Sequence, residues 1–156
     1  MTPGFAVLAA ALAIALMGGI AWRLGNGRMR SVPITGVSAD DPGQGDAMRS
    51  DALTSGQLGH ALGERATLVQ FSSAFCAPCR ATRRILTDVA AMTEGVAHVE
   101  IDAESRLDLV RALGVLRTPT VLVLAGDGRV VRRASGQPRK PDVIAAIGDA
   151  VSLTMD

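Results

Sequence analysis

The two cysteines of this chain lie close together, in the stretch Cys76-Ala77-Pro78-Cys79. A strand-like, mostly apolar run over residues 67–71 precedes them, and residues 80–92 follow with the apolar spacing of an amphipathic helix. A Cys-x-x-Cys pair at a strand-to-helix junction is typical of a redox site. The N-terminus of a helix presents unpaired N–H groups and partial positive charge, which favour a thiolate on the first sulfur. Because the thiolate is the species that attacks disulfides, this stretch predicts thiol–disulfide chemistry.

Helical and strand-like segments alternate over residues 51–156. The apolar spacing predicts helices at 54–62, 80–92, 106–113 and 141–151, and strands at 67–71, 96–101, 121–124 and 129–133. Strands separated by a helix imply a parallel pair, whereas the glycine-rich turn at residues 126–128 implies an antiparallel hairpin. We therefore expect an α/β domain with a central mixed sheet flanked by helices.

The N-terminal residues form a separate segment. Residues 4–22 contain no charged side chain, and as a helix they would extend roughly 30 Å, the hydrocarbon thickness of a bilayer. Trp22 at the end of the run suits the membrane interface. A cleaved signal peptide is the alternative, but no Lys or Arg precedes the run, as such a peptide requires. The pattern predicts a transmembrane anchor over residues 1–23 that contacts the lipid bilayer through residues 4–22.

Arginines follow the apolar run at Arg23, Arg28 and Arg30, and no Lys or Arg comes before it. The positive-inside rule then places the C-terminal side of the anchor in the cytoplasm. From residue 31 to about residue 50 the chain is rich in Gly, Pro, Ser and Asp and has no apolar period. We expect a flexible linker over residues 24–50 and a folded domain over residues 51–156.

Composition excludes some classes of protein. The net charge is +1 and aromatic residues make up 3% of the chain, so a nucleic-acid partner is not expected. A zinc site is an alternative use of the two cysteines. It needs two further ligands, and the two histidines, His60 and His98, lack the spacing of a zinc finger. We expect no metal.

A longer set of motifs resembles the thioredoxin family. The matching features occur in the family's order over residues from about 54 to 153. They are the strand Leu68–Phe71, Cys76-Ala77-Pro78-Cys79, the pair Ile101-Asp102, Thr118-Pro119-Thr120 and Gly136. The resemblance implies the thioredoxin-like fold for the domain and leaves the N-terminal anchor and the linker outside it.

The resemblance also implies roles for the matched residues. Cys76 would be the exposed nucleophile, and Cys79 the buried thiol that resolves the mixed disulfide. Pro78 would limit backbone freedom at low cost, because early helix positions need no N–H partner. Pro119 would be a cis-proline facing the cysteines, and the backbone of Thr118 would pair with an extended substrate segment.

The chain departs from the family pattern at several positions. Gln70 stands where the family usually has a buried aspartate, and an amide cannot act as a general base for Cys79. His98 matches the position of the family's lysine. Phe75 replaces a tryptophan and Ala77 a glycine, and both change the shape of the docking surface without preventing disulfide exchange.

These features together predict a membrane-anchored thiol–disulfide oxidoreductase that reduces protein disulfides in the cytoplasm. Disulfide exchange implies no cofactor within this domain, so a separate electron donor such as a reductase is expected. Two alternatives remain. One is an outward-facing protein that serves the thiols of exported proteins or cytochromes, and the other is a non-catalytic binding module on the same fold.

Overall fold

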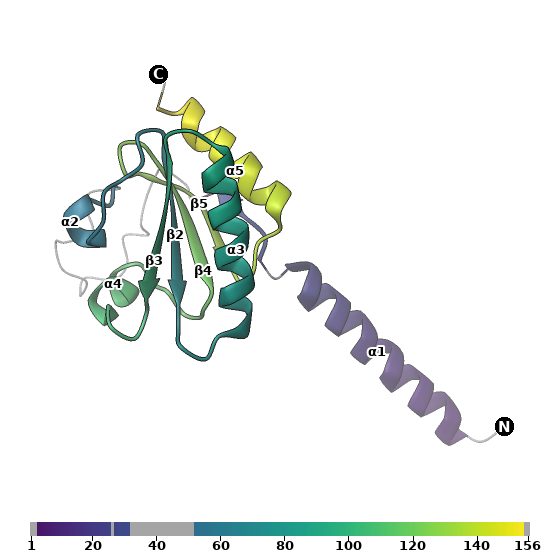
Figure 1. Cartoon of the computed structure of the whole chain (residues 1–156). Helices are drawn as coiled ribbons and strands as arrows, with labels where there is room; N and C mark the ends of the chain where they lie inside the picture. The colour runs from purple at the N-terminus through teal and green to yellow at the C-terminus, as the bar shows by residue number, and fades with distance from the viewer. Residues whose placement is uncertain (1–2, 26, 32–51, 155–156) are drawn as a thin grey trace, which may run out of the picture.

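A mixed sheet forms the centre of the domain, and helices cover its two faces (Figure 1). The computed structural model describes residues 3–25, 27–31 and 52–154. Within them the strands are β1 (Arg30–Ser31), β2 (Ala66–Ser72), β3 (Val96–Asp102), β4 (Thr120–Ala125) and β5 (Val130–Ser135). The helices are α1 (Pro3–Gly25), α2 (Ser55–Leu58), α3 (Ala77–Met92), α4 (Leu107–Ala112) and α5 (Lys140–Ser152).

The strand order in the sheet is β1-β5-β4-β2-β3. Strand β2 pairs in parallel with β3 and antiparallel with β4, and β4 and β5 form the antiparallel hairpin. The expected mixed sheet is therefore confirmed. Every residue of β2 and of β4 is buried, since both strands have a neighbour on each side and helices on each face.

Alternate residues of β2 enter two separate hydrophobic cores, because successive side chains of a strand point to opposite faces. Leu68 packs with residues of α3 and α5, whereas Val69 and Phe71 pack with residues of α2 and α4. In Figure 1, α3 and α5 accordingly lie together on one side of the sheet and α2 and α4 on the other. Gln70 shares the face of Leu68 and so points beneath α3.

Helix α3 begins at Ala77, earlier than the sequence pattern indicates. Cys76 is its N-cap residue, and Pro78 lies in the first turn, where the missing N–H costs no helical hydrogen bond. Leu86 and Val89 on its buried stripe anchor it in the core shared with α5. The start of α3 places both cysteines at its N-terminal end.

Strand β1 is an addition that the sequence analysis did not predict. It pairs with β5 through Arg30 and Arg133, inside the range expected to be linker. Just before it, the N–H of Gly27 donates to the carbonyl of Ser135 at 3.0 Å. Gly27 has a φ of 78°, and a Cβ there would overlap the carbonyl of Gln137, so only glycine fits. Residues 32–51 lie outside the described residues, and the boundaries of anchor, linker and domain stay a prediction.

Helix α1 covers the run that the sequence analysis assigns to a membrane anchor. It extends away from the domain in Figure 1, with apolar side chains such as Val7, Ile14 and Met17 exposed. Among the residues that the structure describes, no helix combines the length and the apolar character needed to cross a membrane. The transmembrane anchor stays a prediction from the sequence.

Substitution of the buried stripe of α3 tests this packing. Leu86→Ala is expected to lower the free energy of unfolding by about 2–5 kcal/mol, since Leu86 is fully buried and the change leaves a cavity. Ile144→Ala on α5 is the matched control. Its side chain is 47% exposed, so a loss of about 1 kcal/mol or less is expected. Urea unfolding of the oxidised chain measures both, and equal losses would contradict the assignment of Leu86 to the core.

Candidate active site

The two cysteines lie where β2 passes into α3, and a disulfide joins them. Cys76 is half-buried, whereas Cys79 is only 2% exposed. The N–H of Cys79, in the first turn of α3, donates to the Cys76 sulfur at 3.2 Å and to the Cys76 carbonyl at 3.1 Å. An attacking group from solvent therefore meets Cys76 first, and the N-terminal end of α3 favours negative charge on its sulfur.

A second loop, before β4, is fastened to the loop that precedes Cys76. The peptide bond between Thr118 and Pro119 is cis, as the family resemblance implied. The hydroxyl groups of Ser73 and Thr118 are hydrogen-bonded at 3.1 Å, and the N–H of Gly136 donates to the carbonyl of Pro119 at 2.7 Å. Sequence reasoning missed Ser73, because nothing in the sequence marks a serine after a buried strand as a partner of a distant loop.

The residues expected to shape the docking surface are exposed beside the disulfide. Phe75 is 98% exposed, and Ala77 and Pro78 also face solvent. Leu116, close to Thr118 in the second loop, is 95% exposed and was not singled out in the sequence. Phe75, which directly precedes Cys76, and Leu116, on the loop that is hydrogen-bonded to Ser73, are large apolar side chains that stay in water and suit contact with a partner protein.

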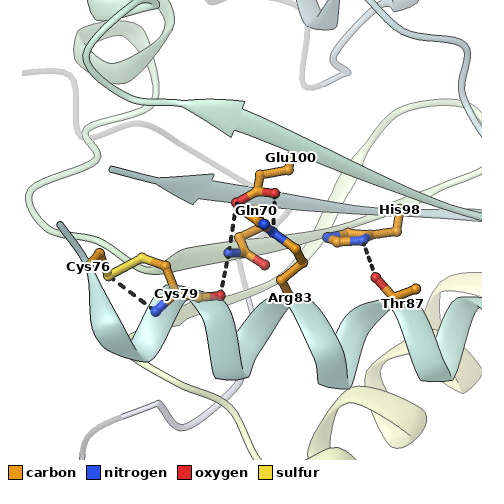
Figure 2. Close-up of polar contacts among 7 residues, drawn as sticks. All are labelled: Gln70, Cys76, Cys79, Arg83, Thr87, His98 and Glu100. Atoms are coloured by element: carbon orange, nitrogen blue, oxygen red, sulfur yellow. Dashed lines mark hydrogen bonds and ion pairs between the residues drawn. A yellow bond between two sulfur atoms is a disulfide. The ribbon is translucent and has the colours of Figure 1, made fainter. Parts of the chain in front are cut away.

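Gln70 lies behind the inner cysteine. It is fully buried, and its amide Nε2 donates to the carbonyl of Cys79 at 3.0 Å (Figure 2). The same Nε2 lies 3.5 Å from Oε1 of Glu100, at the limit of a hydrogen bond. Among the described residues, Gln70 Oε1 has no hydrogen-bond partner. The amide thus fastens the first turn of α3 to the sheet without carrying a charge.

Glu100, and not His98, is the cross-strand neighbour of Gln70. The register of β2 against β3 pairs Gln70 with Glu100 and Leu68 with His98. Sequence reasoning singled out His98 from the family position and missed Glu100, since strand register is set by the packed structure. The charged neighbour of Gln70 is therefore a carboxylate.

Arg83 on α3 holds the Glu100 carboxylate with two contacts. Arg83 Nη2 lies 2.7 Å from Oε1 and Nε lies 2.5 Å from Oε2. Burial raises the pKa of the Glu100 carboxyl, but hydrogen bonds from Arg83 and Ser72 and the Arg83 charge outweigh it and hold the pKa below its usual range. Glu100 is therefore ionised at neutral pH. The sequence analysis did not predict this ion pair.

His98 lies further along the same face of β3. Its Nδ1 is 3.2 Å from the hydroxyl of Thr87 on α3, and within the described chain its buried Nε2 has no hydrogen-bond partner (Figure 2). Burial lowers the pKa of His98, and the Arg83 charge lowers it further, while Glu100 partly opposes both. The imidazole is accordingly neutral at neutral pH.

A zinc site, the alternative use of the two cysteines, needs two further ligands. Across residues 3–25, 27–31 and 52–154, no three side chains of His, Cys, Asp or Glu gather in a way that could hold a metal ion. The partner of each cysteine sulfur is the other cysteine.

A family model described as thioredoxin matches residues 54–149, more than half of the chain. The chain belongs to the thioredoxin family. It is 27% identical over 108 residues to the thioredoxin of Mycolicibacterium smegmatis, which covers 67% of this chain and 93% of that protein. It is 34% identical over 58 residues to human thioredoxin domain-containing protein 2, which covers 37% of this chain but only 10% of that protein.

Solved thioredoxin structures resemble the domain as well. A mutant thioredoxin from Halobacterium salinarum superposes with a TM-score of 0.52 at 25% identity, over 56% of this chain and 76% of that one. A complex of ferredoxin:thioredoxin reductase with thioredoxin f2 gives a TM-score of 0.50 at 21% identity, over 56% of this chain and 79% of that one. The second likeness concerns the fold alone. Family membership and the adjacent cysteines are consistent with thiol–disulfide oxidoreductase activity in general.

The environment of His98 predicts a pH-dependent stability. Because its folded pKa lies below the unfolded value, the unfolded chain binds more protons, and stability falls as the pH drops from about 7.5 to about 5.5. His98→Gln should flatten this part of the curve of unfolding free energy against pH. His60→Gln, which changes the exposed second histidine, is the matched control and should keep the wild-type slope. A wild-type slope in His98→Gln would contradict the prediction.

Proposed function

We propose that this thioredoxin-family chain reduces disulfides of protein substrates through the Cys76/Cys79 dithiol. One observation carries the proposal. The accessible sulfur of Cys76 lies at the N-terminus of a sixteen-residue helix, and the shielded sulfur of Cys79 lies one turn further on. This asymmetry suits a two-step exchange in which the outer sulfur meets the substrate and the inner sulfur meets only Cys76.

In the first step the Cys76 thiolate attacks one sulfur of the substrate disulfide. The substrate S–S bond breaks, its other sulfur leaves as a thiolate that takes a proton from solvent, and a mixed disulfide joins Cys76 to the substrate. The N–H groups at the start of α3, including that of Cys79, stabilise the attacking thiolate. Phe75 and Leu116 offer apolar contact area, and the backbone at Thr118 and Pro119 offers an edge for an extended substrate segment.

In the second step the Cys79 thiol loses its proton and attacks the Cys76 sulfur. The mixed disulfide breaks, the second substrate sulfur leaves as a thiolate, and the Cys76–Cys79 disulfide forms. The substrate gains two electrons and the protein dithiol loses two. A separate reductase must then return two electrons, a role for which the thioredoxin f2 complex with its reductase is a precedent in another protein.

Serine substitutions separate the two cysteines. Cys76→Ser is expected to abolish reduction of a model protein disulfide such as that of insulin, because no outer nucleophile remains. Cys79→Ser is expected to perform the first step only, and so to accumulate a mixed disulfide visible by mass spectrometry or non-reducing gels. Full activity in Cys76→Ser would exclude the proposed mechanism and favour a binding module.

Membrane attachment with a cytoplasmic domain is a separate proposal based on the sequence pattern. The uncharged run 4–22 is followed by Arg23, Arg28 and Arg30, which favours the cytoplasm for everything after it. We expect the full chain to sediment with membranes through a high-pH carbonate wash, and a fluorescent protein fused after Asp156 to report the cytoplasm. Release into the wash would exclude the anchor, whereas activity of an alkaline phosphatase fusion would favour the outward-facing alternative.

A further inference from the structure

One stripe of α3 faces the sheet with polar rather than apolar side chains. Cys79, Arg83 and Thr87 follow one another at intervals of four residues, so they lie on the same side of the helix. Beneath them, Gln70 bonds the carbonyl of Cys79, Glu100 pairs with Arg83, and Thr87 contacts a histidine of β3 (Figure 2). Polar contacts therefore lead from the carbonyl of Cys79 through Gln70 and Glu100 to Arg83, and the contact of Thr87 with the histidine lies beyond them.

Few charges face this stripe. Strand β2 has no titratable side chain, and the α3 face of β3 offers Glu100, the neutral His98 and Asp102 at the strand end. From α5 comes Lys140, which lies 3.9 Å from Asp88 of α3 and so is paired there. Glu100 and Arg83 are the charges that hydrogen bonds connect to Cys79, and Glu100 is shielded enough, at 23% side-chain exposure, for its field to persist.

We propose that the Arg83–Glu100 pair tunes the thiolate of the resolving cysteine, Cys79, with Gln70 as the positioning residue between them. The inference rests on the proposed function, since it concerns the second step of that exchange. The Glu100 carboxylate disfavours a thiolate on Cys79, and the Arg83 guanidinium favours it. While the ion pair is intact the two effects largely cancel, so the pair has little net effect on the pKa of Cys79.

Because Glu100 and Arg83 carry opposite charges, removing one should shift the pKa of Cys79 in the opposite direction to removing the other. Glu100→Gln leaves Arg83 uncompensated and should lower the pKa of Cys79, whereas Arg83→Gln leaves the carboxylate uncompensated and should raise it. For one uncompensated charge in a partly buried site, a shift on the order of half a unit to one unit is expected. Because a thiolate of lower pKa is also a weaker nucleophile, the rate of resolution below the pKa should change by only about two- to threefold.

The experiment measures the second exchange step, the attack of Cys79 on the mixed disulfide at Cys76, in the full-length reduced chain. Dithiobis(nitrobenzoate) reacts first at accessible Cys76, which releases one nitrothiobenzoate and leaves the other in a mixed disulfide. Cys79 then attacks the Cys76 sulfur, loses its proton to solvent and releases the second nitrothiobenzoate. The absorbance of nitrothiobenzoate gives the rate of this second release. Plotted against pH from about 6 to about 10, the rate shows an inflection at the pKa of Cys79.

Glu100→Gln is expected to move the inflection to lower pH and to speed the second phase at neutral pH, and Arg83→Gln to do the reverse. The double variant should return close to wild type. Arg84→Gln and Asp88→Asn remove one charge of each sign from the same helix without touching Glu100 or Gln70, and should leave the inflection in place.

A role in stability alone gives a different pattern. Loss of either partner would then change resolution in the same direction, or not at all, and the double variant would not recover. Either result overturns the tuning role while leaving the exchange mechanism intact. A wild-type chain that releases the first nitrothiobenzoate but never the second overturns the proposed function together with this inference.

Discussion

The packing of α3 on the sheet is the constraint on which the site depends. The helix must bury Leu86 and Val89 in the core shared with α5 and at the same time present its first turn to solvent. Both demands are met because the buried stripe begins only at Cys79, while Ala77, Pro78 and Arg80 face outward. The position at which the helix enters the core makes Cys76 accessible to solvent and Cys79 buried. The difference in exposure between the two cysteines and the stability of the fold therefore have a common origin.

The same packing decides how polarity is tolerated beneath the cysteines. A fully buried carboxylate at position 70 would have to be paired or protonated, whereas the neutral amide of Gln70 needs only hydrogen bonds. The chain keeps its negative charge one strand away, at Glu100, where partial exposure and Arg83 stabilise it. The neutral amide of Gln70 thus contacts Cys79 directly, and the negative charge of Glu100, compensated by Arg83, lies one strand away.

Much of this could be predicted from the sequence. The alternation of apolar runs and the turn at residues 126–128 gave the elements of the mixed sheet, and the spacing of motifs indicated the thioredoxin family and the cis bond at Pro119. What could not be predicted depends on contacts between distant segments. Three such contacts leave no local pattern in the sequence, because each requires two segments to be already packed. They are the register that places Glu100 beside Gln70, the Ser73–Thr118 hydrogen bond and the pairing of β1 with β5.

The docking of Gly27 has a mechanical consequence. Its bond to Ser135 and the bond from Gly136 to Pro119 join the end of α1 to the cis-proline loop through two adjacent residues of the chain. A load applied at Gly27 would therefore reach the loop whose Thr118 is hydrogen-bonded to Ser73, on the approach to the cysteines.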